Sequence, residues 1–469
     1  MLFTKLTLDT PILIVGGAGT IGSSTALHLR RRGYTNLKLI DSYPFPSGGS
    51  GNSQSAGGSD LNKIVGYADG GVRGELAEET MRGWREDPVF REHYYEVGEL
   101  ALASLPSNIA SLHSEYIHHK TSPSNHPDPD PLEWLSTPSD IIHRAPHLKA
   151  ESIQGWQGTY RPRAGWAGAM DAIDSVGEEL KRLGGVEMIF GSSGTFSRPL
   201  IDPLTSRCIG VIAKDGTRHF AERVVMATGA WTPSLVDLEG QCVSKCWIVA
   251  HLELTDEEAA RYKGIPVVYN EEVGFLFEPR YVRDPSTGTS RWIIKLCDEF
   301  PGYTRYLPVR PFRPGKSGNS KPIPSEPINV SVPRSHSDHP TDTVPDEGMM
   351  RLRRVVEVML PEFAEREFVK SYCCWCTDTD DAEWLFCEHP SCPGLFLATG
   401  DSGHSFTSLP IVGGQVADLL EGKMSPERME RLGWRPGRGD PDHTGRGGPP
   451  AKDLGDLPGW AHGDDPKEV

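Results

Sequence analysis

Residues 12–22 read ILIVGGAGTIG, an apolar run that leads directly into glycines with the spacing Gly-x-Gly-x-x-Gly. Gly17 permits a tight turn, Gly19 lets a pyrophosphate approach the backbone, and Gly22 lets the following helix pack closely against the strand. The pattern predicts a buried strand that turns into a helix whose N-terminus faces phosphate charge. The cofactor contacts expected from this turn are Gly17, Gly19, Thr20, Ile21 and Gly22.

The segment that follows completes a strand–helix–strand unit. Residues 23–32 have the apolar spacing of a helix, and residues 37–40 form a second apolar run that ends at Asp41. Asp41 follows Gly22 by nineteen positions, where a carboxylate that binds ribose is expected. Glycines also mark ordinary turns, so a purely structural unit is the alternative. The complete order of elements favours dinucleotide binding, with Asp41 and Ser42 as further contacts.

Composition and charge limit the class of protein. The 469 residues suggest two or three domains, and 37% hydrophobic with 24% charged residues is ordinary for a soluble globular protein. A formal net charge of −16 argues against nucleic acid or an anionic membrane as a partner. The sequence has no stretch of roughly 20 apolar residues and no signal-peptide pattern. We therefore expect an intracellular protein, cytoplasmic or else peroxisomal without a recognisable C-terminal signal. It is expected to be a monomer or a small homo-oligomer.

Further apolar runs end in the tripeptide Ala-Thr-Gly, at residues 227–229 and again at residues 398–400. Such an ending brings the backbone close to the carboxyl edge of a sheet, where doubly wound folds bind their ligands. Together with the glycine turn, the two endings favour a large dinucleotide held from several sides, so FAD is expected rather than NAD. Gly229 and Val186, which begins another apolar run, are included among the expected FAD contacts.

Between residues 240 and 370 the pattern changes to alternating runs, which indicate an antiparallel sheet with one buried face. The expected fold class is α/β: a Rossmann-type FAD-binding domain (glutathione-reductase-like) with an inserted antiparallel β-sheet substrate domain (α+β). Helical spacing also occurs at residues 86–102 and 170–183. The expected FAD-binding domain comprises residues 1–85, 150–240 and 370–435, the substrate domain residues 86–149 and 241–369, and a C-terminal arm residues 436–469.

Two segments of unusual composition are open to more than one interpretation. Five of the nine cysteines fall within residues 373–392, which in a large intracellular chain suggests metal or redox chemistry. Their spacing lacks the paired pattern of zinc ligands, so zinc is the weakest interpretation, beside inert buried thiols and one thiol bonded to a flavin. The Gly- and Ser-rich residues 47–59 form either a flexible linker or a loop against a flat or charged ligand.

Three polar side chains are candidates for chemistry. Lys295 ends a β-type run, where a lysine is usually solvated; over a flavin, its ammonium could stabilise superoxide-like charge as O₂ accepts electrons. Glu299 is either an exposed loop residue or a site for a cationic amine. His404 follows an Ala-Thr-Gly end and is either a core histidine or a neighbour of the flavin.

Several of these blocks, taken in order, resemble the fungal fructosyl amino acid oxidases. Those enzymes, also called amadoriases, are relatives of monomeric sarcosine oxidase. The resemblance covers most of the chain, from residue 11 to about residue 460. The matching blocks are residues 17–22, 60–64, 295–303, 374–379 and 397–404, with Pro458-Gly459-Trp460 near the end.

The resemblance also implies roles for individual residues. Cys374 is expected to form a covalent thioether to the 8-methyl group of the flavin, Lys295 to activate oxygen, and Glu299 to hold the substrate. Lys63 matches a lysine near the flavin, and Arg435 matches a position near the substrate mouth. The further FAD contacts expected from the same blocks are Asn62, Asp401, Gly403 and His404.

One position departs from the pattern of the family. Where the family has Gly-Ser-Gly-His-Gly-Phe-Lys, residues 401–407 read DSGHSFT, so a neutral Thr407 replaces a lysine that contacts substrate. The charge-assisted hydrogen bond of an ammonium is worth about 1.5–3 kcal/mol, and fructosyl amino acids are therefore doubtful substrates. The chain ends in Pro-Lys-Glu-Val and lacks the Ser-Lys-Leu type of peroxisomal signal.

The expected function is that of an FAD-dependent oxidase of a secondary or N-substituted amine. It oxidises the C–N bond to an imine and reduces O₂ to H₂O₂. A small-molecule amine and O₂ are the expected partners, and no metal site is expected. The alternatives are a biosynthetic FAD amine oxidase or dehydrogenase with a ring-forming or saccharopine-like substrate, and a catalytically silent flavoprotein.

Overall fold

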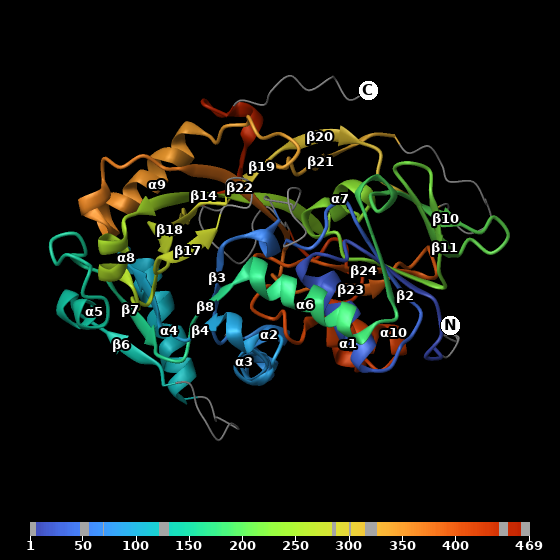
Figure 1. The fold of residues 1–469 in the computed structure, drawn as a ribbon, viewed down its shortest axis with the longest axis horizontal. Helices are drawn as coiled ribbons and strands as arrows, with labels where there is room; N and C mark the ends of the chain where they lie inside the picture. The colour runs from blue at the N-terminus through green and yellow to red at the C-terminus, as the bar shows by residue number, and fades with distance from the viewer. Residues whose placement is uncertain are drawn as a thin grey trace.

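A parallel sheet and a larger, mostly antiparallel sheet form the framework of the computed structural model (Figure 1). Parts of the Gly- and Ser-rich loop (residues 47–55), Pro301 and parts of the C-terminal arm (residues 440–448 and 461–469) lie outside the described residues. The structure describes residues 6–46, 56–68, 70–121, 131–283, 288–299, 302–314, 326–439 and 449–460.

The parallel sheet begins with the strand–helix–strand unit expected from residues 12–41, which is confirmed. β1 (Ile12–Val15) is buried along its whole length and pairs in parallel with β2 and β13, as expected of a strand covered on both faces. The strand order is β23-β24-β13-β1-β2-β9, with β23 antiparallel to β24. The other strands of this sheet are β2 (Leu37–Asp41), β9 (Val186–Phe190), β13 (Arg223–Met226), β23 (Leu385–Glu388) and β24 (Leu395–Thr399).

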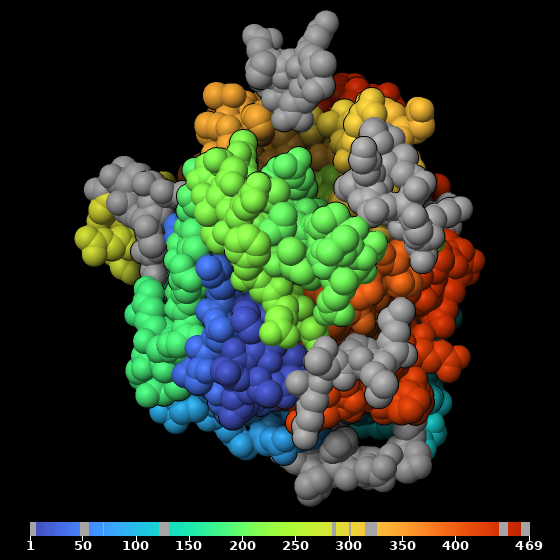
Figure 2. Space-filling model, turned by 90° about the vertical axis from the view of Figure 1, so that its right-hand side faces the viewer, coloured from blue at the N-terminus to red at the C-terminus, as the bar shows by residue number. Residues whose placement is uncertain are grey.

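Helices cover one face of this sheet, and a small sheet covers the other. Successive side chains of β1 point to opposite faces of the sheet. Ile12 and Ile14 pack in the cluster with the helices, whereas Leu13 and Val15 pack towards the small sheet. Figure 2 shows the small sheet in green beside the N-terminal segment in blue. The helices are α1 (Thr20–Arg31), α6 (Ala169–Leu183) and α10 (Val412–Glu421), and the small sheet contains β10 (Phe196–Ile201), β11 (Cys208–Ala213) and β12 (Arg218–Phe220).

The larger sheet is built around β14 (Cys242–Leu254), which pairs antiparallel with β18 on one side and β22 on the other. Its order is β25-β19-β14-β18-β16-β15-β5-β7-β6, with β17 on β18 and β22 on β14. α8 (Asp256–Tyr262) and α9 (Asp346–Met359) pack on one face. The remaining strands are β5 (Glu99–Ala103), β6 (Glu133–Leu135), β7 (Gln157–Arg161), β15 (Val267–Asn270), β16 (Gly274–Leu276), β17 (Arg280–Arg283), β18 (Ser290–Cys297), β19 (Tyr303–Thr304), β22 (Lys370–Thr379) and β25 (Lys452–Asp453).

Smaller elements join the two sheets. β3 (Asn62–Val65), β8 (Gly165–Gly168) and β4 (Tyr94–Tyr95) pair as a short antiparallel sheet between them (Figure 1). The other elements are α2 (Gly71–Glu75), α3 (Ala77–Glu86), α4 (Pro106–Thr121), α5 (Pro138–Arg144), α7 (Thr232–Leu235), β20 (Tyr306–Val309), β21 (Ile328–Ser331) and α11 (Pro426–Leu432).

The expected domain boundaries stay a prediction, although strand pairing bears on them. β22 falls in the expected FAD-binding segment 370–435, yet it pairs with β14 of the larger sheet from Lys370 to Thr379. β7, in the expected segment 150–240, also pairs with β5 of that sheet. The chain therefore passes between the two sheets more often than composition suggested.

Two expected elements differ from the structure. The helical spacing at residues 86–102 was misleading, because α3 ends at Glu86 and β5 begins at Glu99. Pairing of β5 with β15 and β7 outweighs the local pattern there. The apolar run that ends in the first Ala-Thr-Gly, expected as one strand over residues 219–226, is divided between β12 and β13, which belong to different sheets.

The crossing of α1 and α10 gives a test of this packing. A Cβ atom on Gly413 would lie 2.1 Å from the backbone carbonyl group of Ser24. We expect Gly413→Ala to push the helices apart and to lower the free energy of unfolding by about 1–3 kcal/mol. In the control Gly414→Ala, the new methyl group meets the His28 ring at 3.2 Å, and an effect below about 1 kcal/mol is expected because a small shift relieves this contact and alanine favours the helix. Chemical denaturation measures both, and equal losses would contradict the packing argument.

Candidate functional site

The glycine turn lies at the carboxyl end of β1, where α1 begins. Gly19 is the N-cap of α1 and provides no side-chain cap within the described structure, so the first N–H groups of the helix remain available to an anion. A Cβ atom on Gly17 would lie 2.0 Å from the Leu39 side chain, and one on Gly22 would lie 2.3 Å from the Gly16 carbonyl oxygen. Both positions therefore require glycine. The structure brings Gly17, Gly19, Thr20, Ile21 and Gly22 together in this one turn.

Asp41 lies beside this turn, at the carboxyl end of β2. Its Oδ2 accepts a hydrogen bond from the Ala18 backbone N–H at 3.0 Å, and its Oδ1 accepts one from the Tyr43 N–H at 3.2 Å. Burial raises the pKa of Asp41 to about 6, although these backbone hydrogen bonds oppose the shift. Ser42 is exposed in the same loop. The two residues are thus placed next to the glycine turn, as expected from their spacing.

The Ala-Thr-Gly endings also meet at this edge, because β13 and β24 are parallel neighbours. The Thr399 hydroxyl donates a hydrogen bond to the Gly229 carbonyl oxygen at 3.3 Å. Beyond β24, the Thr377 N–H donates to Asp401 Oδ1 at 2.6 Å, and the Ser402 N–H donates to the Thr377 carbonyl oxygen at 2.8 Å. The edge of the parallel sheet is thereby joined to β22, the strand that carries the cysteines.

A second connection runs through the segment before β3. A Cβ atom on Gly58 would lie 2.9 Å from Oγ1 of Thr20 in the first turn of α1. Two residues earlier, Ala56 forms a backbone bridge with Trp375 of β22. The glycine turn near the N-terminus and the thiol-bearing strand near the C-terminus therefore converge within a few residues of each other.

Cys374 lies on the face of β22 that points towards β3. Alternate residues Tyr372, Cys374 and Cys376 share this face and pack in one buried cluster with Trp247. Lys63 Nζ approaches the Cys374 Sγ atom at 3.5 Å. Burial raises the pKa of the Cys374 thiol, and the Lys63 ammonium opposes this shift.

Lys295 is the centre of a buried polar cluster. It is 1% exposed, and its Nζ donates to Asp60 Oδ2 at 2.5 Å and to the Asn62 carbonyl oxygen at 2.8 Å. Lys63 Nζ lies 2.9 Å from the same Asp60 oxygen, and the Tyr372 hydroxyl donates to the other at 2.6 Å. The Lys295 ammonium also lies 5.0 Å from the centre of the Phe277 ring. Lys295 is therefore not the solvated strand residue that was one of its two interpretations.

Opposing effects set the charges in this cluster. Burial opposes ionisation of Asp60, but the ammonium groups of Lys295 and Lys63 outweigh it and hold the pKa of Asp60 well below its usual range. Burial lowers the pKa of Lys295, and Asp60 partly opposes that shift. For Lys63 burial is also unfavourable, yet Asp60 and Cys374 outweigh it and raise the pKa.

Two of the expected substrate residues, Glu299 and Thr407, lie near this cluster. Glu299 follows β18 two residues after Cys297 and is half-buried. The Thr407 hydroxyl donates to the Ile64 carbonyl oxygen of β3 at 3.1 Å. Gly403 and His404 are exposed in the loop after β24, so His404 is not the core histidine that was its alternative interpretation.

Two expected site residues are not brought to this place. Val186 pairs with Leu37 at the amino end of its strand, about 13 Å from the carboxyl edge at 3.3 Å per residue. Arg435 is buried, and its guanidinium donates to both oxygens of Asp381 at 3.0 Å and to the Glu383 and Gly433 carbonyl oxygens. Because the guanidinium N–H groups of Arg435 already donate to these acceptors within the protein, few of them remain to bind a substrate.

The structural role of Arg435 can be measured. Arg435→Ala removes the bidentate partner of the partly buried Asp381 and leaves it, of the described cationic groups, only the longer contact with Arg438 at 3.5 Å, and we expect the free energy of unfolding to fall by about 1.5–3 kcal/mol. The KM for amine substrate should change less than about twofold, since the guanidinium is occupied within the fold. Asp381→Asn is the matched control and should cause a smaller loss of stability. A large rise in KM without loss of stability would instead support the substrate role expected from the sequence.

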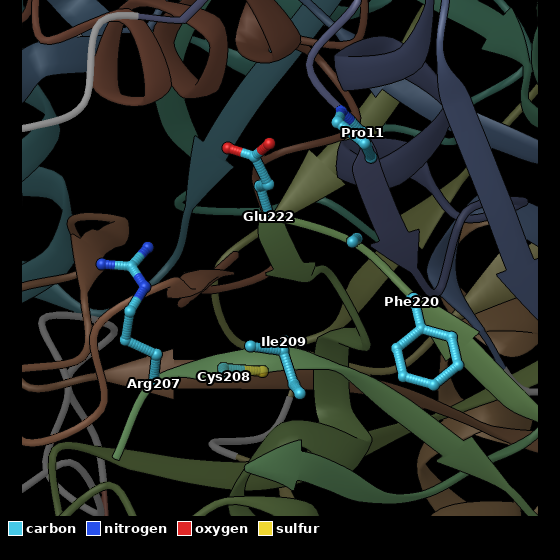
Figure 3. Close-up of a pocket in the computed structure, with 7 residues that line it drawn as sticks. Pro11, Arg207, Cys208, Ile209, Phe220 and Glu222 are labelled. Atoms are coloured by element: carbon cyan, nitrogen blue, oxygen red, sulfur yellow. The ribbon is translucent and has the colours of Figure 1, made fainter. Parts of the chain in front are cut away.

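An open hollow elsewhere on the molecule is separate from this site. It has a volume of about 590 Å³ and lies at the amino end of the parallel sheet, since Pro11 precedes β1 and Glu222 precedes β13 (Figure 3). Phe220 and Arg207 complete its wall. The glycine turn is at the opposite edge. Within the described residues, no group of three His, Cys, Asp or Glu side chains is arranged to hold a metal ion, and no helix is long and apolar enough to cross a membrane.

Sequence reasoning missed Asp60 and Tyr372 as members of the site. Asp60 and Lys63 are three residues apart, and that charge pairing was a signal that could have drawn attention to Asp60. Its contact with Lys295 joins residues 235 positions apart in the chain. Only the pairing of β3 and β18 with their neighbours brings that contact about.

Comparisons with known proteins show the family to which this chain belongs. The model of the FAD-dependent oxidoreductase (DAO) family matches residues 12–419. The chain belongs to this family. The solved structure of fructosyl peptide oxidase from E. terrenum is 42% identical, with a TM-score of 0.87, over 97% of this chain and 99% of that one. Amadoriase II from Aspergillus fumigatus is 32% identical, with a TM-score of 0.81, over 98% and 99% of the two chains.

A curated relative extends this range of similar enzymes. L-saccharopine oxidase from Schizosaccharomyces pombe is 29% identical over 90% of this chain and 93% of its own. These findings confirm the expected resemblance and the expected class: an FAD-dependent amine oxidase that acts on a C–N bond. They also confirm an FAD-binding fold of mixed α and β content.

The residues at the site fit FAD. The uncapped N-terminus of α1 suits the pyrophosphate, and Asp41 lies where a ribose is expected. Asn62 is 1% exposed, and neither of its amide side-chain atoms has a hydrogen-bond partner among the described residues. An unpaired buried amide costs about 1–3 kcal/mol, so these atoms are suited to a ligand that supplies the missing partners.

Proposed function

We propose that the protein oxidises a secondary or N-substituted amine with O₂ as the acceptor and carries FAD covalently bound through Cys374. The observation that carries this proposal is the cluster in which Lys295, Lys63 and Asp60 meet Cys374 beside the glycine turn. When bound, FAD supplies the redox chemistry, taking electrons from the amine and passing them to O₂. The chain supplies position and charge.

Each residue has a proposed task in this arrangement. Lys295 holds a buried positive charge where O₂ is reduced, an electrostatic contribution of the oxyanion-hole type. Cys374 fixes one end of FAD, while the glycine turn and Asp41 hold the other. Glu299 binds the amine substrate, with His404 and Asp401 at the border between FAD and substrate. The fold proposed for this arrangement is a Rossmann-type, glutathione-reductase-like FAD-binding domain with an inserted substrate domain.

The test is peroxide release by purified protein with a panel of amines. The panel contains N-methyl amino acids, fructosyl amino acids, fructosyl peptides, saccharopine-like and cyclic amines, because relatives named for fructosyl peptides and saccharopine are both similar to this chain. Release of H₂O₂ in equal amount to the imine-derived product is expected with at least one class. Anaerobic bleaching of FAD without peroxide release in air would favour a dehydrogenase, and no bleaching with any amine would favour the silent flavoprotein.

Thr407 provides a prediction about the substrate. A lysine at this position would add an ammonium near Ile64, and we expect Thr407→Lys to lower the KM for a substrate that bears a carboxylate by about 10-fold or more, from a charge-assisted hydrogen bond of about 1.5–3 kcal/mol. Steady-state kinetics with a substrate and its amide-blocked analogue measures the effect. Thr407→Met, similar in length but uncharged, is the control. Equal changes in both variants would show that side-chain length matters and charge does not.

A further inference from the structure

Asp60 is a buried carboxylate shared by two lysines. It is 1% exposed and contacts Lys295 at 2.5 Å and Lys63 at 2.9 Å through one oxygen. The other oxygen accepts hydrogen bonds from the Tyr372 hydroxyl at 2.6 Å and the Leu61 N–H at 2.7 Å. Four donors therefore converge on one carboxylate in the interior.

Two ammonium groups in the interior need a nearby negative charge. A buried ion pair that loses one member leaves an uncompensated charge, which the protein usually relieves by a change of protonation. If Asp60 were neutral, Lys295 and Lys63 would face each other across it with no other negative group of the described residues in contact with Lys295. Lys295 is the more deeply buried of the two, since the Lys63 side chain is 24% exposed. The proton would therefore be lost from Lys295.

We propose that Asp60 is the positioning residue that keeps Lys295 charged and fixed in place for the reaction with O₂. This inference rests on the proposed function of Lys295. Asp60 acts through the ammonium of Lys295, and the Tyr372 and Leu61 donors in turn hold its carboxylate in the orientation that Lys295 requires.

Other titratable groups around Lys295 do not replace Asp60. Lys63 on β3 repels the ammonium. The Cys297 thiol on β18 carries no charge near pH 7, because burial raises its pKa. Burial lowers the pKa of His251 on β14 to about 3, so it is neutral and adds no charge. On β22, burial raises the pKa values of the Tyr372 hydroxyl and the Cys374 thiol, so both stay neutral near pH 7. Within the part of the chain that the structure describes, Asp60 is thus the negative group in contact with Lys295.

The substitution Asp60→Asn tests this assignment, because it removes the charge and keeps the shape. Burial already lowers the pKa of Lys295, and loss of Asp60 lowers it further. The ammonium is then lost as pH rises through that lower pKa. We expect the rate of reaction of the reduced variant with O₂ to fall at least about tenfold as pH rises, over a range in which the rate of the natural protein stays constant.

A second measurement does not depend on turnover. The visible absorbance of FAD bound to Asp60→Asn should change with the same pH midpoint as the O₂ rate, because a charge beside the ring is lost there. Tyr372→Phe removes one hydrogen bond from Asp60 and keeps its charge, so its profile should stay flat. If Asp60→Asn does not fold or bind FAD, Asp60→Asn with Lys63→Met removes one charge of each sign, and a loss of O₂ reactivity as pH rises is still expected, at a higher pH than in Asp60→Asn because Lys63 no longer repels the Lys295 ammonium.

Lys295→Met in the same assay separates this inference from the proposed function. A Lys295→Met rate equal to that of the natural protein would overturn the role of Lys295 itself. A slow, pH-independent Lys295→Met variant together with an Asp60→Asn variant as fast and as pH-independent as the natural protein would overturn the role of Asp60 alone. A pH-dependent Asp60→Asn variant whose dependence disappears on adding Lys295→Met is the expected result.

Discussion

Lys295→Met is expected to slow the reaction of the reduced enzyme with O₂ by about 10²–10³-fold, the usual effect of removing one preorganised electrostatic group. The reason is that Lys295 is buried, lies beside Asp60 and Asn62, and is placed where the proposed FAD site meets the larger sheet. Reduction of the enzyme by amine under anaerobic conditions should change only a few fold, because that step develops no negative charge on O₂. Stopped-flow absorbance measures the two half-reactions separately.

Lys295→Arg is the matched control for this prediction. It keeps a positive charge of similar reach, and part of the O₂ rate should be recovered. Equal slowing of both half-reactions in Lys295→Met would contradict the assigned role, because it would indicate general damage to the site.

Cys374→Ala is expected to abolish covalent attachment of FAD completely. Acid precipitation of the natural protein should give a yellow pellet, whereas the variant should give a colourless pellet and a yellow supernatant. The thiol lies 3.5 Å from the Lys63 ammonium, which partly opposes the rise that burial causes in the pKa of Cys374.

Cys376→Ala provides the matched control on the same strand face. Its thiol lies 3.4 Å from Asp378 Oδ1 and packs in the same buried cluster as Cys374. Its pellet should remain yellow. A colourless pellet from the natural protein would contradict covalent binding. If the pellet of Cys376→Ala is colourless and that of Cys374→Ala is yellow, the bond is to Cys376.

The first strand–helix–strand unit could be predicted because all its determinants are local. The apolar run, the glycine spacing and Asp41 lie within residues 12–41, and β1, α1 and β2 have nearly the expected bounds. Local signals were misleading where partners are distant. β5 has a pattern compatible with a helix, yet it pairs with β15, which is more than 160 residues away in the chain.

In the candidate site too, residues in local motifs could be predicted, whereas contacts between distant segments could not. Cys374, Lys295, Glu299 and Lys63 could be named from motifs, because each lies in a short block with a recognisable pattern. Asp60 could not be assigned a role, since its function depends on Lys295 on another strand. Arg435 was expected near the substrate, but its neighbour in space, Asp381, occupies the guanidinium.

The amino-acid sequence alone determined the dinucleotide turn and the preference for FAD, because a phosphate-binding turn is encoded by consecutive residues whose spacing is fixed by backbone geometry. The class of reaction followed from the resemblance of several ordered blocks to the fructosyl amino acid oxidases. The tertiary structure decided which charges meet in the interior. The buried ion pair of Asp60 and Lys295 joins residues far apart in the chain, and its energy depends on a separation and a burial that no local pattern contains. The position of Lys295 between Asp60, Lys63 and the cysteine strand is the result of that packing.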